Sequence, residues 1–242
     1  MTKQLPNLKI NPENLPERVI VCGDPNRAKK IASLLTESSL LAENREYHSY
    51  SGKWNGKEVA VVSHGVGAPG AAVCFEELIM GGAKYLIRVG TAGSYQKEIT
   101  PGSIVISTAS VSTDGLTKQI VPPGFPAVSD RYIIEALCHA AEDFGGDIQV
   151  KEGITLTLDA FYSGVIDFPH QLYKKAGVLA VEMENAALFV ISSLKGVKSG
   201  AILAIDGYAD AELREEYDPH TELVVKAIEA EAQIALNAIA RL

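Results

Sequence analysis

Short apolar runs alternate along the chain with longer segments of helical periodicity. The runs are rich in valine and isoleucine, as expected for strands buried in a sheet. They cover residues 18–22, 58–64, 84–89, 103–108, 154–158, 178–181 and 201–205. The predicted helices cover residues 26–35, 70–80, 130–144, 183–193 and 219–242. This alternation predicts an α/β fold with a mixed central β-sheet flanked by helices.

Length and composition support one compact unit. The chain has 242 residues, of which 47% are hydrophobic and 21% charged, and a single α/β core of this size is common. No linker, internal repeat or low-complexity tract interrupts the alternation, so we expect a single domain over residues 1–242. The net charge of −8, without a cluster of basic residues, argues against nucleic acid as a partner.

The cysteines and the apolar segments set further expectations. Cys22, Cys74 and Cys138 show no CxxC spacing, so neither a disulfide framework nor a zinc site is expected. No signal-peptide pattern is present, and no apolar run approaches the ~18 residues that a membrane helix needs. We therefore expect a cytoplasmic protein with no membrane partner and no metal.

Two predicted strands end in residues suited to an anion. Gly23 and Arg27 follow the first strand, where a helix begins, and backbone N–H groups at a helix start attract anions. A tight turn with a surface arginine is the alternative. Arg88 and Thr91 lie at the end of another strand, where guanidinium and hydroxyl groups suit phosphate. An internal salt bridge of Arg88 to a carboxylate is the alternative there.

The segment 63–70 formally matches the GxGxxG dinucleotide-binding pattern. However, no acidic residue for a ribose follows the next strand, and Pro69 lies inside the supposed phosphate turn. The match therefore predicts a structural turn, and His64 is assigned no catalytic role.

Carboxylates and apolar side chains meet at the junction after residues 178–181. Val181, Glu182, Met183 and Glu184 offer acceptors for sugar hydroxyls beside an apolar surface. Favourable placement of carboxylates in the first turn of a helix is the structural alternative.

Three other residues are candidates for a catalytic or a stacking role. Asp206 ends the strand 201–205 and is either a turn former or a general acid. Phe161 and Tyr162 could stack on an aromatic base or belong to the core.

Taken together, these motifs resemble the nucleoside phosphorylase-I family, which contains hexameric purine nucleoside phosphorylases and uridine phosphorylases. Within it, the segments 44–47, 63–67 and 74–78 look most like the compact purine enzymes of malaria parasites. The motifs in family order and spacing are Gly-Asp-Pro-x-Arg at 23–27, Asn-Arg-Glu-Tyr at 44–47, His-Gly-Val-Gly at 64–67, Arg-x-Gly-Thr-x-Gly at 88–93, Phe-Pro-Ala-Val at 125–128, Asp-x-Phe-Tyr at 159–162, Val-Glu-Met-Glu at 181–184 and Asp206.

The resemblance implies phosphorolysis of a nucleoside to a free base and a pentose 1-phosphate, with inorganic phosphate as co-substrate and no cofactor. It also implies a homo-oligomer, a trimer of dimers, whose active sites are shared between subunits. It assigns phosphate binding to Gly23, Arg27, Arg88, Thr91 and, from a neighbouring subunit, Arg45. It assigns nucleoside binding to Phe161, Tyr162, Val181, Glu182, Met183 and Glu184, and catalysis to Asp206 as the acid.

Three departures from the family pattern bear on specificity. Asn7 stands where family members carry a histidine for the sugar 5′-hydroxyl, and Arg214 is the candidate for the arginine that supports the acid. The Gln-x-Arg pair by which uridine phosphorylases read a pyrimidine is absent from 163–167. The sequence therefore predicts a purine nucleoside phosphorylase acting in purine salvage. The alternatives are a uridine phosphorylase, a nucleosidase that uses water, and a non-catalytic nucleoside-binding protein.

Overall fold

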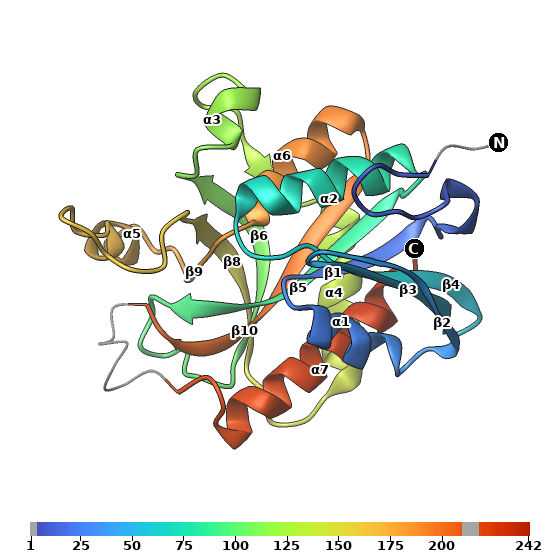
Figure 1. Ribbon diagram of the computed structural model, residues 1–242. Coiled ribbons are helices and arrows are strands. Elements are labelled where there is room, and N and C mark those ends of the chain that lie inside the picture. Colours follow the sequence, from blue (N-terminus) through green and yellow to red (C-terminus); the bar gives the residue numbers. More distant parts are fainter. Residues whose placement is uncertain (1–3, 210–217) are drawn as a thin grey trace.

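The computed structural model describes residues 4–209 and 218–242 (Figure 1). Its strands are β1 (Arg18–Cys22), β2 (Thr36–Asn44), β3 (Tyr47–Trp54), β4 (Lys57–Ser63), β5 (Tyr85–Ser94), β6 (Ile104–Ser112), β7 (Ala127–Val128), β8 (Val150–Thr157), β9 (Ala180–Glu182) and β10 (Lys198–Tyr208). Its helices are η1 (Pro12–Asn14), α1 (Pro25–Ala32), α2 (Ala68–Met80), α3 (Thr117–Ile120), α4 (Arg131–Phe144), α5 (His170–Lys175), α6 (Asn185–Lys195) and α7 (Glu222–Ile239).

All described strands belong to one mixed sheet in the order β10-β6-β8-β9-β5-β1-β4-β3-β2, with β7 beside β6. β1 runs parallel to β4 and β5, whereas β3 runs antiparallel to β2 and β4. β10 also pairs with β5, so that β10, β6, β8, β9 and β5 close into a ring. The predicted mixed sheet and single-domain α/β class are confirmed.

Helices cover both faces of the sheet (Figure 1). Ile20 of β1 packs in the cluster that contains residues of α1, α4 and α7, and its neighbour Val21 packs in the cluster that contains residues of α2 and α6. Successive side chains of a strand point to opposite faces, so a strand covered on both sides is apolar at every position. This burial on both faces explains the continuous apolar runs of the sequence.

The structure departs from the sequence prediction in several elements, of which the β2–β3 hairpin and the end of β5 bear most on the fold. The hairpin of β2 and β3 was not predicted, because much of it is exposed or half-buried and carries no continuous apolar run. β5 continues to Ser94 through a glycine-rich segment that propensity assigns to a loop. Pairing with β10 along Tyr85–Ser94 supplies the hydrogen bonds that keep this segment extended.

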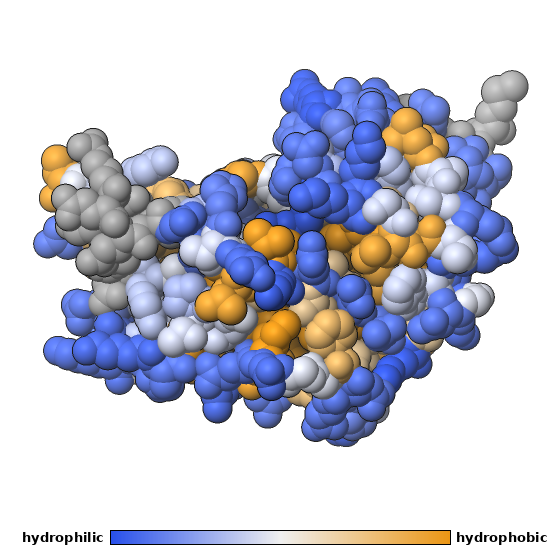
Figure 2. Space-filling model, turned by 90° about the horizontal axis from the view of Figure 1, so that it is seen from below, coloured by the Kyte–Doolittle hydropathy of each residue, from blue (hydrophilic) through white to orange (hydrophobic). Residues whose placement is uncertain are grey.

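Within residues 4–209 and 218–242, no helix is both long and apolar enough to cross a bilayer. Seen from below the view of Figure 1, the surface has separate apolar groups across its middle, with hydrophilic side chains between and around them (Figure 2).

Glu77 of α2 fastens the N-terminal segment to the domain. Its side chain is 3% exposed and accepts hydrogen bonds from the backbone N–H groups of Asn7 and Leu8, each at 2.9 Å. The Asn7 amide donates to the same carboxylate at 2.6 Å, and Asn44 Nδ2 donates to the Asn7 carbonyl at 2.7 Å. The side chain of Asn7 is therefore engaged within its own subunit.

Replacing Glu77 by alanine is expected to lower the free energy of unfolding by about 1–3 kcal/mol, because the N–H groups of the docked segment lose their acceptor. Urea unfolding followed by circular dichroism measures the change. Glu76→Ala is the matched control on the same helix, because the Glu76 side chain is 37% exposed and pairs with Lys195 at 3.1 Å. Its expected cost is below about 1 kcal/mol. Equal losses in the two variants would contradict a docking role for Glu77.

Candidate functional site

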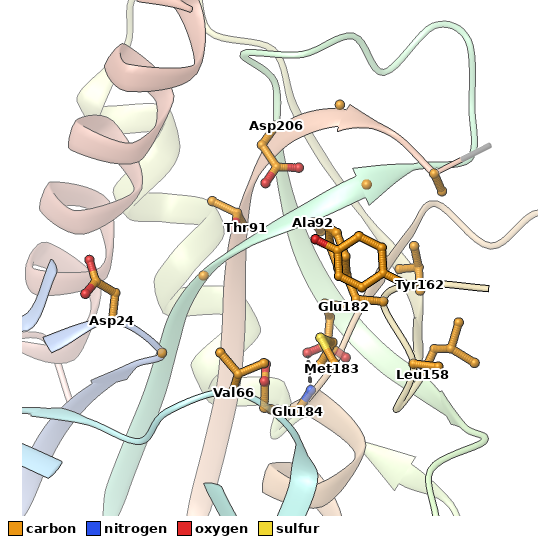
Figure 3. A pocket seen from close by; sticks show the side chains of 18 of the residues that line it. Asp24, Val66, Thr91, Ala92, Leu158, Tyr162, Glu182, Met183, Glu184 and Asp206 are labelled. Carbon is orange, nitrogen blue, oxygen red and sulfur yellow. Dashed lines mark hydrogen bonds between the residues drawn. The ribbon is translucent and has the colours of Figure 1, made fainter. Parts of the chain in front are cut away.

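A cavity of about 1280 Å³ opens where β1, β5, β9 and β10 end (Figure 3). Ligands of open α/β sheets bind at such carboxyl ends, since several chain segments deliver side chains there. The residues lining this cavity include Gly23, Arg27, Arg88, Thr91, Phe161, Tyr162, Val181, Glu182, Met183, Glu184 and Asp206. The structure thus brings together every site residue expected from the sequence except Arg45.

Arg88 projects from β5 and is 4% exposed. Its guanidinium lies 3.3 Å from the Glu182 carboxylate, pairs closely with Glu184, and donates to Asn185 Oδ1 at 3.1 Å. A Cβ atom at Gly90 would lie 2.7 Å from Nη1, so only glycine leaves room for this guanidinium. The internal salt bridge considered from the sequence is therefore present. Among the described residues, no partner accepts a hydrogen bond from Arg88 Nε.

Glu182 supports the start of α6 from the last position of β9. Its Oε2 accepts the N–H groups of Glu184 at 2.6 Å and Asn185 at 2.8 Å, which satisfies donors that a helix start leaves open. Thr157 donates to the other oxygen. Burial raises the pKa of Glu182, although the Arg88 guanidinium acts in the opposite direction. These contacts give Glu182 a structural role, because its carboxylate stabilises the start of α6.

Glu184 connects α6 to the turn that precedes α2. One oxygen accepts the Gly67 N–H at 2.6 Å, and the other pairs with Arg88. Burial acts to raise the pKa of Glu184, but Arg88, His64 and the Gly67 N–H together hold it below its ordinary value. Glu184 is therefore an ionised carboxylate inside the cavity.

The glycine-rich segment before α2 is a turn, and its Gly67 N–H binds a protein carboxylate. His64 at its start is fully buried, with Nδ1 2.8 Å from the Gly65 carbonyl and its ring edge-on to Phe75. Burial lowers the pKa of His64 to about 4, so the ring is neutral at physiological pH.

The start of α1 differs in one detail from the anion-binding site predicted from the sequence. Asp24 caps α1, and its carboxylate accepts the N–H groups of Asn26 at 2.9 Å and Arg27 at 3.2 Å. These two donors of the helix start are occupied by the protein, so they are not open to an anion as predicted. The cationic groups that remain at the cavity are the side chains of Arg27 and Arg88.

Asp206 reaches the cavity through an irregularity in β10. The register with β5 shifts between Ile205, which pairs with Ala92, and Gly207, which pairs with Gly93. The extra residue is Asp206, and such a bulge turns a side chain away from the regular alternation. Figure 3 shows its carboxylate above Thr91, across the cavity from the segment 182–184. Asp206 is 8% exposed.

Phe161 and Tyr162 lie between β8 and α5 at the open side of the cavity. They are 47% and 77% exposed, and their rings meet edge-to-face at 5.1 Å between centroids. Neither is a core residue, and both line the cavity. Phe168 and His170, which the sequence did not indicate, also line the cavity.

One arginine considered from the sequence lies away from the cavity. Arg45 is exposed in the turn between β2 and β3 with φ at 55°, and it does not line the cavity of its own chain. Arg214 falls outside the described residues.

A buried carboxyl behind the cavity was missed by the sequence reasoning. Glu231 of α7 is fully buried, and its Oε2 accepts the Ala204 N–H at 2.8 Å. Burial raises the pKa of Glu231 to about 8. The available signal was its place on the apolar face of α7, four residues from both Ala227 and Ala235, which are buried.

Comparison with known proteins agrees with this geometry. Residues 17–241 match the phosphorylase superfamily. A purine nucleoside phosphorylase of Plasmodium falciparum is 40% identical over 245 residues, covering 100% of this chain and 98% of that protein. A uridine phosphorylase of Treponema pallidum is 39% identical over 203 residues, covering 78% and 76%. The solved structure of purine nucleoside phosphorylase from Toxoplasma gondii in complex with immucillin-H has a TM-score of 0.95 at 32% identity, covering 100% and 96%.

Fold and site together define a class of α/β proteins whose ligand cavity lies at the ends of the sheet strands. The chain belongs to the phosphorylase superfamily, as the match over nearly its whole length shows. The resemblance recognised from the sequence motifs is confirmed.

The burial of Glu231 predicts a pH-dependent loss of stability. The folded chain holds a proton on a group of pKa about 8 that the unfolded chain releases near its ordinary pKa of 4.5. The stabilisation is complete below the lower pKa and is lost as the pH rises through the higher one. Between about pH 6 and about pH 9, we expect the free energy of unfolding to fall by roughly 3 kcal/mol relative to Glu231→Gln.

Urea unfolding at several pH values checks this expectation. Glu229→Gln is the matched control, since Glu229 is exposed on the same helix. Its curve should follow that of the unmodified protein. Parallel pH profiles for the unmodified protein and Glu231→Gln would show that Glu231 carries no extra proton in the fold.

Proposed function

We propose that this protein is a purine nucleoside phosphorylase, which cleaves the N-glycosidic bond of purine ribonucleosides and deoxyribonucleosides with inorganic phosphate. One observation carries the proposal: a single cavity holds two guanidinium groups, an ionised carboxylate beside a methionine, and an aspartate, contributed by Arg27, Arg88, Glu184, Met183 and Asp206. These are the groups that phosphate, a sugar and a departing base each need.

The reaction joins a phosphate oxygen to C1′ as the bond from C1′ to the base nitrogen breaks, with inversion at C1′. Its transition state resembles an oxocarbenium ion, whose positive charge is stabilised by nearby phosphate and carboxylate. Gly23, Arg27, Arg88 and Thr91 hold the phosphate. The proposed chemistry needs no metal or organic cofactor.

When the substrates bind, Arg88 and Glu184 exchange their contact with each other for contacts with the phosphate and the sugar. Arg88 Nε has no hydrogen-bond partner among the described residues, which leaves one donor for the phosphate. Glu184 turns from Arg88 to the 2′- and 3′-hydroxyls of the sugar, which donate to its carboxylate. Met183 and Val181 contact the sugar, and Glu182 keeps the start of α6 in place.

The base leaves at the end of the cavity where Asp206 lies. A purine anion is a poor leaving group until N7 is protonated, and Asp206 supplies that proton. Phe161 and Tyr162 cover the flat face of the base, for which their exposed rings are suited.

Purines are favoured over uridine by the residues that follow Tyr162. The segment 163–167 reads Ser-Gly-Val-Ile-Asp and offers no glutamine and arginine for a pyrimidine edge. The purine enzyme of P. falciparum also aligns with the whole chain. Uridine phosphorylase is the second candidate, because a relative of that name is 39% identical over 78% of the chain.

We further propose that the active site is completed by a second copy in a trimer of dimers. Arg45 is exposed on the β2–β3 turn and lies outside its own cavity. In the proposed assembly this side chain reaches the phosphate of the neighbouring subunit.

The direct test is base release from inosine and from uridine, each with and without inorganic phosphate, with products identified by chromatography. We expect hypoxanthine and ribose 1-phosphate from inosine only when phosphate is present. Uracil release would favour the second candidate, and release without phosphate would indicate a hydrolase. No release from either nucleoside would favour another nucleoside as substrate or a non-catalytic nucleoside-binding protein.

Asp206→Asn is expected to lower kcat for inosine by ~10²- to 10⁴-fold, because the amide cannot donate the proton that the base requires. Phosphate binding, measured by calorimetry, should persist. Asp143→Asn is the matched control, since Asp143 is exposed on α4 and pairs with Arg241. Unchanged turnover in Asp206→Asn would contradict its role as the acid.

A further inference from the structure

Glu231 is a buried titratable group that the proposed reaction does not use. Its side chain is fully buried, although a carboxylate buried without compensation is costly. Helix α7 packs against β10 (Figure 1), and Glu231 contacts Ala204 of that strand. A fully buried carboxyl therefore needs a structural or functional explanation.

The two oxygens of Glu231 have different surroundings. Oε2 accepts the N–H of Ala204, and Ala204 pairs across the sheet with Thr91, a cavity residue. Oε1 lies 3.8 Å from Arg27 Nη1 and accepts no hydrogen bond within the described part of the chain. The carboxyl thus touches β10 with one oxygen and faces a guanidinium of the cavity with the other.

Charged and titratable groups near Glu231 come from α1, β1, β5 and β10. Arg27 of α1 and Arg88 of β5 favour its ionised form, whereas Asp206 of β10 opposes it. Cys22 of β1 also lies in its field, and burial raises the pKa of that thiol to about 12, so it is neutral. The protonation of Glu231 therefore depends on the net charge at the cavity.

We propose that Glu231 is a positioning residue of the phosphate site, which holds Arg27 against β10 and competes with phosphate for its guanidinium when ionised. This inference rests on the proposed phosphorylase function. With Glu231 neutral, the full charge of Arg27 is available to the phosphate. With Glu231 ionised, Arg27 is partly neutralised, and a second negative charge stands behind the anion.

The competition acts in the physiological range. Burial raises the pKa of Glu231 to about 8, so the carboxyl is mostly neutral at pH 7 and mostly ionised at pH 9. Phosphate affinity should therefore fall above neutral pH by more than the ionisation of phosphate itself explains. Bound phosphate in turn favours the neutral carboxyl, so binding near pH 8 should take up a proton.

The test compares inorganic phosphate binding to the unmodified protein, Glu231→Gln and Glu229→Gln by calorimetry at about pH 7 and about pH 9. Glutamine keeps an acceptor for the Ala204 N–H and cannot ionise. The ratio of the Kd of the unmodified protein to that of Glu231→Gln should be near one at the lower pH and at least ~3-fold at the higher pH. Phosphate's own ionisation cancels in this ratio. With inosine, the same pattern should appear in the KM for phosphate, with little change in kcat.

A ratio independent of pH would overturn the inference, because a packing role alone weakens binding equally at both values. A second measurement needs no variant: calorimetry near pH 8 in buffers of different ionisation enthalpy counts the protons taken up with phosphate. No uptake beyond that of phosphate itself would also overturn the inference. If the unmodified protein binds no phosphate, the proposed function falls with it. If phosphate-dependent hypoxanthine release is present and the ratio is constant, only the role of Glu231 falls.

Discussion

The buried guanidinium of Arg88 is the constraint around which the cavity is built. A charge that is 4% exposed must be paired, and its partners come from the junction of β9 and α6, about a hundred residues further along the chain. Gly90 leaves space for it, and Glu184 extends the network to the turn before α2. One ion-pair network thus fixes the relative positions of β5, β9, α6 and α2, whose ends form the wall of the cavity.

The same network explains why neighbouring carboxylates differ. Glu182 is saturated by backbone N–H groups and serves the start of α6, whereas Glu184 keeps its charge through Arg88 and faces the cavity. In the proposed reaction, ligands take over contacts that the protein otherwise satisfies internally. Removing Arg88 would leave two buried carboxylates without their cation, so its loss has a structural effect in addition to its effect on the proposed reaction.

The pairing of strands β5 and β10 also fixes the positions of residues at the cavity. Because β5 and β10 pair over their whole length, Thr91 and the bulge at Asp206 lie at fixed heights above the ion-pair network. Helix α7 covers the same strands from behind and brings Glu231 against Arg27. Arg27 therefore lines the cavity on one side and faces the buried carboxyl of Glu231 on the other.

The sequence by itself determined the alternation of strands and helices, the strand ends that line the cavity, and the family, because buried strands leave continuous apolar runs and the motifs keep their spacing. It did not reveal the β2–β3 hairpin, whose exposed residues show no apolar run. Only the tertiary structure decided that Arg88 pairs with Glu182 and Glu184 and that Glu231 lies against Arg27 and β10. These contacts join residues distant in sequence, and local patterns carry no information about which charge meets which once the sheet has closed.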